Sequence, residues 1–379
     1  MPKGAPLEGG LHRHDAPRDL SNARGPCGDL STARDHPGEL STAGDVSLDV
    51  GPHAGFSGCM NPSAPDPSPV QLAALHSLCR RSELEAVGFD HREIARMLRD
   101  GRLHRTRRGV YAWGDSRGDI EQHLIQARAV LLAQPRAVLS HGSAAALHRI
   151  PVRRAALDWV HVTRPDRGGG RRRNQVVTHC SQLDPSECMV VDALAVTTVP
   201  RSLVDLGCTE PEGWTLAAMD DALRRGLCSA EHLQRSVTSA AGRPGVRGAQ
   251  RAAALADPRS ESVGESLSRH LLVRAGLAPA QLQQEFPHEA GVDRVDFWWE
   301  EGVVGEFDGR LKYRASARPG VSPEEVLWQE KLREDRLRRL GLVVVRWTWD
   351  ELLHQPEVVV ARVRQALAEA RTRRPSVAW

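Results

Sequence analysis

Lysine is almost missing from this chain, and several other features that would point to particular classes of protein are missing too. Among 51 basic side chains only Lys3, Lys312 and Lys331 are lysines, so the positive charge is carried by arginine, which stays protonated near neutral pH. No apolar run approaches the ~20 residues of a membrane-spanning helix, and the first residues lack an apolar segment of the secretory type. The seven cysteines include no CxxC pair, which argues against a zinc ribbon or a disulfide framework. We therefore expect a protein of the reducing cytoplasm with no membrane partner.

The first 69 residues differ in composition from the rest. Asp19, Asp29 and Glu39 each precede the pattern Leu-Ser-Xaa-Ala, in a segment rich in glycine, proline and aspartate. One leucine in each repeat cannot bury a core, so we expect residues 1–69 to be a disordered, low-complexity tail. The alternative is that Met60 is the true start and that the repeat is upstream DNA translated in error.

A length of 379 residues predicts two or three folded domains after this tail. Residues 70–118 predict a small helical unit that ends in a β-hairpin, and residues 119–240 predict a mixed α/β region. Residues 241–259 are rich in glycine and proline and are expected to be a linker. Residues 260–379 predict a helix, three strands, a helix and a strand, in that order. The expected fold class is therefore α/β.

Several elements are predicted more closely. Asp90 is suited to cap a helix from His91 to Arg99, and the apolar spacing in residues 70–79 indicates another helix. Two strands are expected around a basic turn between residues 103 and 113. Further helices are expected over residues 119–133, 192–207, 214–226, 260–275, 323–340 and 357–371.

A group of acidic residues in the last region is the strongest candidate for a chemical site. Residues 300–302 fit a three-residue hairpin loop with Gly302 in the left-handed conformation, and this register places Asp296 opposite Glu306. Asp308 points to the same face, and the preceding helix can add Glu265. Crowded carboxylates repel one another, and a hard divalent cation such as Mg²⁺ (or Mn²⁺) offsets that repulsion with oxygen ligands. The alternative is a solvated acidic face.

Five segments of this region occur in a recognisable order: 264–266, 294–297, 306–313, 330–338 and 344–348. Together they resemble the PD-(D/E)XK nuclease superfamily, and in particular its branch similar to very-short-patch-repair (Vsr-like) endonucleases. The resemblance implies a restriction-endonuclease-like αβββαβ core in which Asp296 and Glu306 hold Mg²⁺ and Glu265 assists. Asp308 stands where the superfamily has a lysine. The lysine role then falls to Lys312 first and to Lys331 second.

The arginine-rich helix expected from residue 330 onward has two interpretations. It can be a phosphate-binding surface beside the acidic site, or an exposed face with i,i+4 ion pairs such as Lys331 with Asp335.

The first folded region has a resemblance of its own. The stretch from Gly88 to Tyr111 resembles the winged helix-turn-helix at the start of AbiEi-type antitoxins. This resemblance implies DNA as a partner and a cognate toxin as a further one. Basic side chains on the helix end and wing suit DNA phosphates: Arg99, Arg102, Arg105, Arg107 and Arg108. The alternative is a small docking platform with solvated arginines.

The middle region is similar to the body of the same antitoxin-like proteins over residues 140–148 and 197–205. Ser140, His141 and His148 suggest nucleophilic catalysis, but a packed helix start capped by Ser140 explains them better. His161 and His179, which Cys180 follows, lack the spacing of zinc ligands.

Two functions from different classes remain open. The first is a Mg²⁺-dependent DNA endonuclease that is targeted by its own DNA-binding module. The second is a non-catalytic, antitoxin-like transcriptional regulator of a type IV toxin–antitoxin system, whose nuclease fold is inactive. Asp296, Glu306 and a nearby lysine favour the first function, and Asp308 in the lysine position favours the second.

Overall fold

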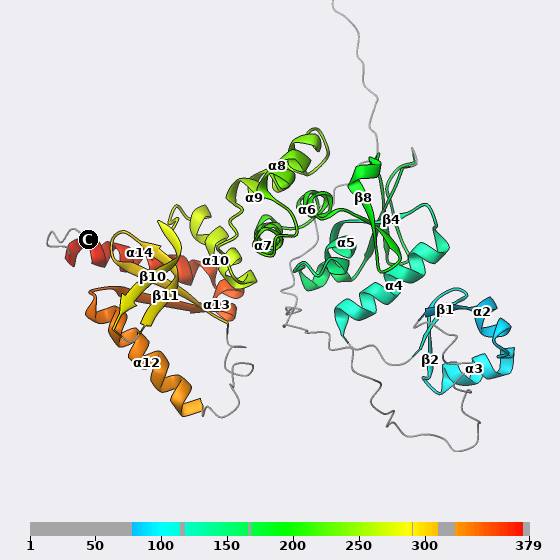
Figure 1. Cartoon of the computed structure of the whole chain (residues 1–379), viewed down its shortest axis with the longest axis horizontal. Helices are drawn as coiled ribbons and strands as arrows, with labels where there is room; N and C mark the ends of the chain where they lie inside the picture. Colours follow the sequence, from blue (N-terminus) through cyan, green and yellow to red (C-terminus); the bar gives the residue numbers. More distant parts are fainter. Residues whose placement is uncertain (1–77, 114–117, 166–167, 290, 310–322, 374–379) are drawn as a thin grey trace, which may run out of the picture. The chain divides into compact units, whose positions relative to one another are not determined.

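Figure 1 shows the computed structural model of the chain, which describes residues 78–113, 118–165, 168–289, 291–309 and 323–373. Within these ranges the chain is a mixed α/β protein whose strands form sheets of three, six and four strands, in chain order. No helix among the described residues has both the length and the apolar character needed to cross a membrane. The tail expected over residues 1–69 and most of the helix expected over 70–79 lie outside the described residues.

The first region is a small unit of three strands and two helices. Its Asp90 caps a helix as predicted: the Asp90 carboxylate accepts the Glu93 N–H at 2.7 Å, and the Glu93 carboxylate accepts the Asp90 N–H at 2.8 Å. The helix expected at residues 78–79 is wrong, because these residues pair with the last strand and bury Cys79. The elements are β1 (Leu78–Arg80), α2 (Arg81–Ala86), α3 (His91–Arg99), β2 (Leu103–Arg107) and β3 (Val110–Trp113), in the sheet order β1-β3-β2.

The second region places a six-stranded sheet beside a group of helices. The predicted helix over residues 119–133 is confirmed. The sheet order is β6-β7-β5-β4-β9-β8. Its strands are β4 (Val138–Leu139), β5 (Val160–Arg164), β6 (Arg171–Arg173), β7 (Val176–Cys180), β8 (Cys188–Val191) and β9 (Leu194–Thr197). Its helices are α4 (Asp119–Ala133), α5 (His141–Leu147), α6 (Val199–Gly207), α7 (Glu212–Arg224), α8 (Ala230–Ser239) and α9 (Val246–Leu255), with short 3-10 turns at Arg154–Leu157 and Pro185–Glu187.

Three expectations for this region are corrected. The helix expected from residue 192 begins only at Val199, because the preceding residues form β9 and complete the sheet. Most of the expected linker over residues 241–259 is helix α9, whose Ala249 and Ala252 are fully buried against α6 and α7. The Ser140 side chain does not cap α5; its hydroxyl oxygen accepts a hydrogen bond from Thr163 at 2.8 Å.

The third region has the predicted order of helix, three strands, helix and strand. The sheet order is β10-β11-β12-β13, with β12 and β13 parallel. The elements are α10 (Val263–Arg274), β10 (Gln281–His288), β11 (Gly291–Trp299), β12 (Val303–Asp308), α12 (Pro323–Arg339), β13 (Val343–Thr348), α13 (Trp349–His354) and α14 (Pro356–Arg373). Helix α13 was not predicted.

Two apolar cores cover the faces of this four-stranded sheet. On one face Phe297 and Trp347 pack with residues of α10 and α14, and on the other Val304 packs with Leu337 of α12. Helix α10 approaches β12 very closely, because a Cβ atom on Gly264 would lie 2.0 Å from the ring of Phe307. This close approach fixes the start of α10, and with it Glu265, against the sheet.

Gly264→Ala is expected to lower the free energy of unfolding by about 1–3 kcal/mol, because the Phe307 ring must move within a packed core. Urea unfolding measures the change. The matched control is Gly169→Ala, where a Cβ meets nothing within 4 Å and the expected change is below about 0.5 kcal/mol. Equal stability of the two variants would contradict the close packing of α10 on β12.

Candidate functional site

The basic surface predicted on the first region is partly assembled. Arg99, Arg105 and Arg108 are exposed at the end of α3 and around the β2–β3 turn, and within the described residues they take part in no ion pair. Arg102 is half-buried. Arg107 turns inward and donates to the backbone carbonyl of Asn174 at 3.4 Å, and burial lowers its pKa. Exposed, unpaired guanidinium groups are the side chains that DNA phosphates attract.

The hairpin register predicted for the acidic site is confirmed. Phe297 pairs with Gly305 and Trp299 with Val303, and Gly302 has the left-handed φ of 84°. The side chains of Asp296 and Glu306 nevertheless make separate sets of contacts, so the expected shared face is wrong. Val295 packs in the core under α12 while Phe297 packs in the core that contains α10, so the regular alternation of β11 is broken at Asp296.

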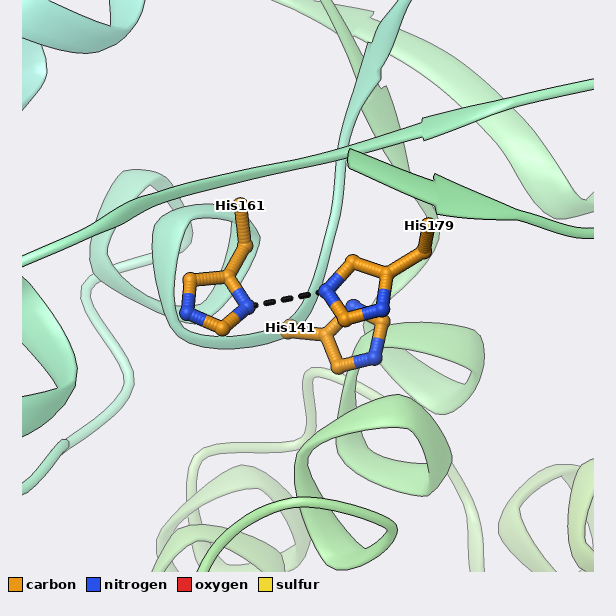
Figure 2. A group of neighbouring side chains, drawn as sticks. All are labelled: His141, His161 and His179. Carbon is orange, nitrogen blue, oxygen red and sulfur yellow. Dashed lines mark hydrogen bonds between the residues drawn. The ribbon is translucent and has the colours of Figure 1, made fainter. Parts of the chain in front are cut away.

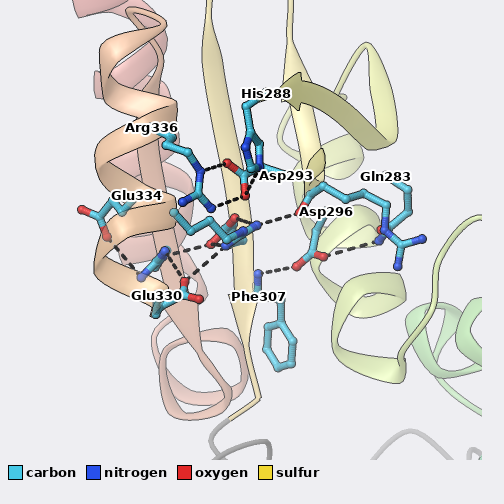
Figure 3. A network of polar contacts seen from close by, with 12 residues as sticks. Gln283, His288, Asp293, Asp296, Phe307, Glu330, Glu334 and Arg336 are labelled. Atoms are coloured by element: carbon cyan, nitrogen blue, oxygen red, sulfur yellow. Dashed lines mark hydrogen bonds and ion pairs between the residues drawn. The ribbon is translucent and has the colours of Figure 1, made fainter. Parts of the chain in front are cut away.

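Asp296 belongs to a polar group at the start of α10 (Figure 3). Its carboxylate accepts the Phe307 N–H at 2.8 Å and a longer contact of 3.4 Å from the Gln283 amide. The same amide nitrogen donates to Glu265 at 2.9 Å. Glu265 is buried, and it also accepts the Ser262 hydroxyl and the Glu261 N–H, each at 2.8 Å. The structure therefore brings Glu265 and Asp296 together through Gln283.

Glu306 lies instead in an ion-pair network with arginines of α12 and β13. Its carboxylate accepts from both terminal nitrogens of Arg333 and from Nε of Arg346 at 3.0 Å. Arg346 also pairs with Glu330 at 2.6 Å and with Glu334 at 3.2 Å. Both Glu306 oxygens are thus engaged by permanent cations. Glu306 as placed does not fit the role of a Mg²⁺ ligand, whereas Glu265 and Asp296 retain the oxygen chemistry that this ion prefers.

The remaining predicted site residues are spread over the third region. Asp308 is half-buried at the end of β12, and Lys331 is exposed on α12. Lys312 lies outside the described residues.

Sequence reasoning missed Gln283, Arg333 and Arg346. The sequence gives no indication of the role of Gln283. Its side chain contacts Glu265 and Asp296 from a position in β10 where the backbone is left-handed, with a φ of 54°. Arg333 lies on the helix that was predicted to be rich in charge, but its partner is the buried Glu306 of β12. Arg346 lies beside Glu306 on the neighbouring strand β13.

Of the residues considered for nucleophilic catalysis, Ser140 and His148 make structural contacts. Ser140 is fully buried, and no substrate reaches its hydroxyl. His148 bonds through Nε2 to the Thr197 carbonyl oxygen at 2.8 Å. These residues hold α5 against the sheet.

The first region is similar to a known family. Residues 69–112 match the family model described as the transcriptional regulator AbiEi antitoxin. Two proteins of Mycobacterium tuberculosis, "Uncharacterized protein MT2308" and "Uncharacterized protein Rv2248", are each 30% identical to the chain over 158 residues. The match covers 41% of this chain and 55% of each relative, so the chain spans about half the length of these curated relatives.

Glu306→Gln is expected to lower the free energy of unfolding by about 2–3 kcal/mol, because it removes the most buried of the carboxylates that neutralise Arg333 and Arg346 and leaves them only Glu330 and Glu334. The value lies at the low end for a buried pair because both arginines are partly exposed. Guanidinium chloride unfolding measures it.

The control is Glu85→Gln, because Glu85 and its partner Arg81 are both about half exposed and the loss of this ion pair should change the free energy of unfolding much less. A loss for Glu306→Gln no greater than for the control would contradict the network.

Proposed function

We propose that the chain is a DNA-binding transcriptional regulator of the AbiEi antitoxin kind. The observation that carries the proposal is the family match over residues 69–112, which coincides with the unit that exposes the basic helix end and wing. The family description also makes a cognate toxin the expected second partner.

The fold of the first region supports this proposal, because its core holds α3 in place and leaves the basic side of that helix exposed. The buried Leu84, Ile94 and Met97 hold α2 and α3 on the small sheet. Helix α3 is thereby rigid, and its exposed side bears His91, Arg92 and Arg99. In a winged helix-turn-helix the second helix of the pair enters the major groove and a wing touches the backbone. Helix α3 and the β2–β3 hairpin are in the right chain order for those two roles.

The double variant Arg105→Ala/Arg108→Ala is expected to weaken DNA binding and to reduce its salt dependence. Each lost phosphate contact removes roughly 0.9 from the slope of log K against log salt, so two contacts remove roughly 2. Fluorescence anisotropy on labelled duplex DNA that includes the region upstream of the gene, between about 50 and 200 mM salt, measures the slope.

The matched control is Arg235→Ala/Arg247→Ala, which removes two exposed arginines from α8 and α9. The control should bind like the parent. If both double variants lower the slope equally, binding is a property of overall charge and the wing has no special role.

A second candidate is a DNA endonuclease formed by the third region. The observation in its favour is that Glu265 and Asp296 contact the same Gln283 amide beside the sheet. Glu265 and Asp296 would hold a Mg²⁺ or Mn²⁺ ion, which when bound supplies Lewis-acid activation of a phosphodiester. The placement of Glu306 among arginines counts against this candidate.

Cleavage of supercoiled plasmid with Mg²⁺ or Mn²⁺, against EDTA, tests the second candidate. An endonuclease should nick DNA only with metal, and Asp296→Asn should abolish nicking while DNA affinity stays unchanged. The control is Asp350→Asn, an exposed aspartate on α13 whose carboxylate contacts His354. Absence of metal-dependent nicking by the parent protein rejects the endonuclease and leaves the regulator proposal intact.

A further inference from the structure

Three histidines from distant parts of the second region meet at one place (Figure 2). His141 is the first residue of α5, His161 lies in β5 and His179 lies in β7. One ring nitrogen from each of the three lies within 4.8 Å of the others. The Nδ1 atom of His161 and the Nε2 atom of His179 are only 3.0 Å apart, and the His141 ring stacks on the His179 ring with centroids 3.7 Å apart.

The topology of the sheet produces this meeting. Strands β5 and β7 are parallel neighbours in which Thr163 pairs with His179, so His161, two residues before Thr163, lies on the same face as His179. The backbone N–H of Ser140 donates to the His161 carbonyl at 3.1 Å, which brings the start of α5 to the same point. The histidines are 20 and 18 residues apart in the chain, so their spacing does not resemble a sequence motif for zinc.

The surroundings hold the His141 ring in place. The Nδ1 atom of His141 contacts the Ser140 hydroxyl at 3.0 Å, and that hydroxyl oxygen is itself held by Thr163. Such an outer contact orients an imidazole and leaves its other nitrogen for a ligand.

Most of the positive charge near the cluster is neutralised. Arg201 and Arg243 act on His141 and Arg172 acts on His161, and each would by itself repel a cation. Arg201, however, is paired with Asp205 at 2.8 Å and with Glu187 at 2.7 Å. Arg243 lies 3.6 Å from Asp205 and 3.8 Å from Glu187. The carboxylates of Asp205 and Glu187 thus balance Arg201 and Arg243, and the exposed Arg172 is the remaining positive charge that a divalent ion would meet.

We propose that His141, His161 and His179 form a binding site for Zn²⁺, with a fourth coordination position left for water or for an anionic group of a partner. Imidazole nitrogen suits Zn²⁺, and three protein ligands are the arrangement of an open site. Ligand nitrogens around tetrahedral Zn²⁺ are about 3.3 Å apart, given bonds of about 2.0 Å. The His161–His179 pair is close to this separation. The His141 ring, which stacks nearly parallel to the His179 ring, completes the set when it leaves the stack and turns its Nε2 atom toward this pair.

The site is independent of the DNA-binding proposal, since all three ligands lie outside residues 69–112. A bare stack of neutral histidines is the competing explanation, and metal content separates the two. Tag-free full-length protein, stripped with a chelator, is incubated with Zn²⁺ and desalted, and its zinc is measured by mass spectrometry. We expect about one zinc per chain and a higher melting temperature with zinc than without, since an ion that binds only the folded state stabilises it.

His161→Gln and His179→Gln should each weaken zinc binding at least about tenfold, because each removes a ligand. His232→Gln is the matched control, because His232 is exposed on α8 and belongs to the same region. Far-UV circular dichroism establishes that each variant is folded. A parent protein that retains no zinc, or folded cluster variants that bind zinc like the control, would overturn the proposal.

X-ray absorption at the zinc edge measures the type and distance of the atoms bound to zinc in the parent protein. This measurement does not depend on whether any variant folds. The proposed site predicts imidazole nitrogen at about 2.0 Å and no sulfur. A shell of cysteine sulfur would place the ion elsewhere, and would equally overturn the assignment.

Discussion

A guanidinium group that cannot lose its proton must be neutralised wherever the fold buries it, and this constraint organises the interior of the protein. Arg269 donates to the buried Asp220 at 2.6 Å, and Arg201 donates to the buried Asp205 at 2.8 Å. Burial alone raises the pKa of Asp205 and Asp220, and the arginine beside each opposes that rise. A lysine in these places could escape the cost by deprotonation, but this chain is nearly devoid of lysine.

The need to neutralise arginines also determines the role of Glu306 in the third region. Glu306 satisfies Arg333 and Arg346, so its charge is already used for holding α12 and β13 to the sheet. The contacts of Glu265 and Asp296 among the described residues include an amide, a hydroxyl and backbone N–H groups. A metal ion in the third region would therefore be held at the start of α10, by Glu265 and Asp296, and not by Glu306 at the centre of the sheet.

Much of the fold could be predicted from local signals, and the failures share a physical cause. The Asp90 cap, the helix over residues 119–133 and the Gly302 hairpin depend on neighbouring residues only, and all three were predicted. Helix α9 was mistaken for a linker because its start is rich in glycine. Those glycines serve packing, since a Cβ atom on Gly248 would lie 2.5 Å from the Gly207 carbonyl oxygen of α6. The separation of Asp296 from Glu306 and the meeting of the three histidines depend on tertiary contacts, which no spacing rule reports.

The distribution of paired and unpaired arginines also bears on function. In the second and third regions, the buried arginines described above are matched by carboxylates, so they contribute to stability and not to an external field. At the end of α3 and on the β2–β3 wing, Arg99, Arg105 and Arg108 are exposed, and no ion pair among the described residues involves them. Exposed charge without a counter-charge contributes nothing to the fold, but it is free to act on a phosphate backbone. Arg235 and Arg247 are exposed in the same way on α8 and α9, so exposure alone does not distinguish Arg99, Arg105 and Arg108. What distinguishes these three is their position on a helix end and a wing, where side chains can follow a DNA backbone.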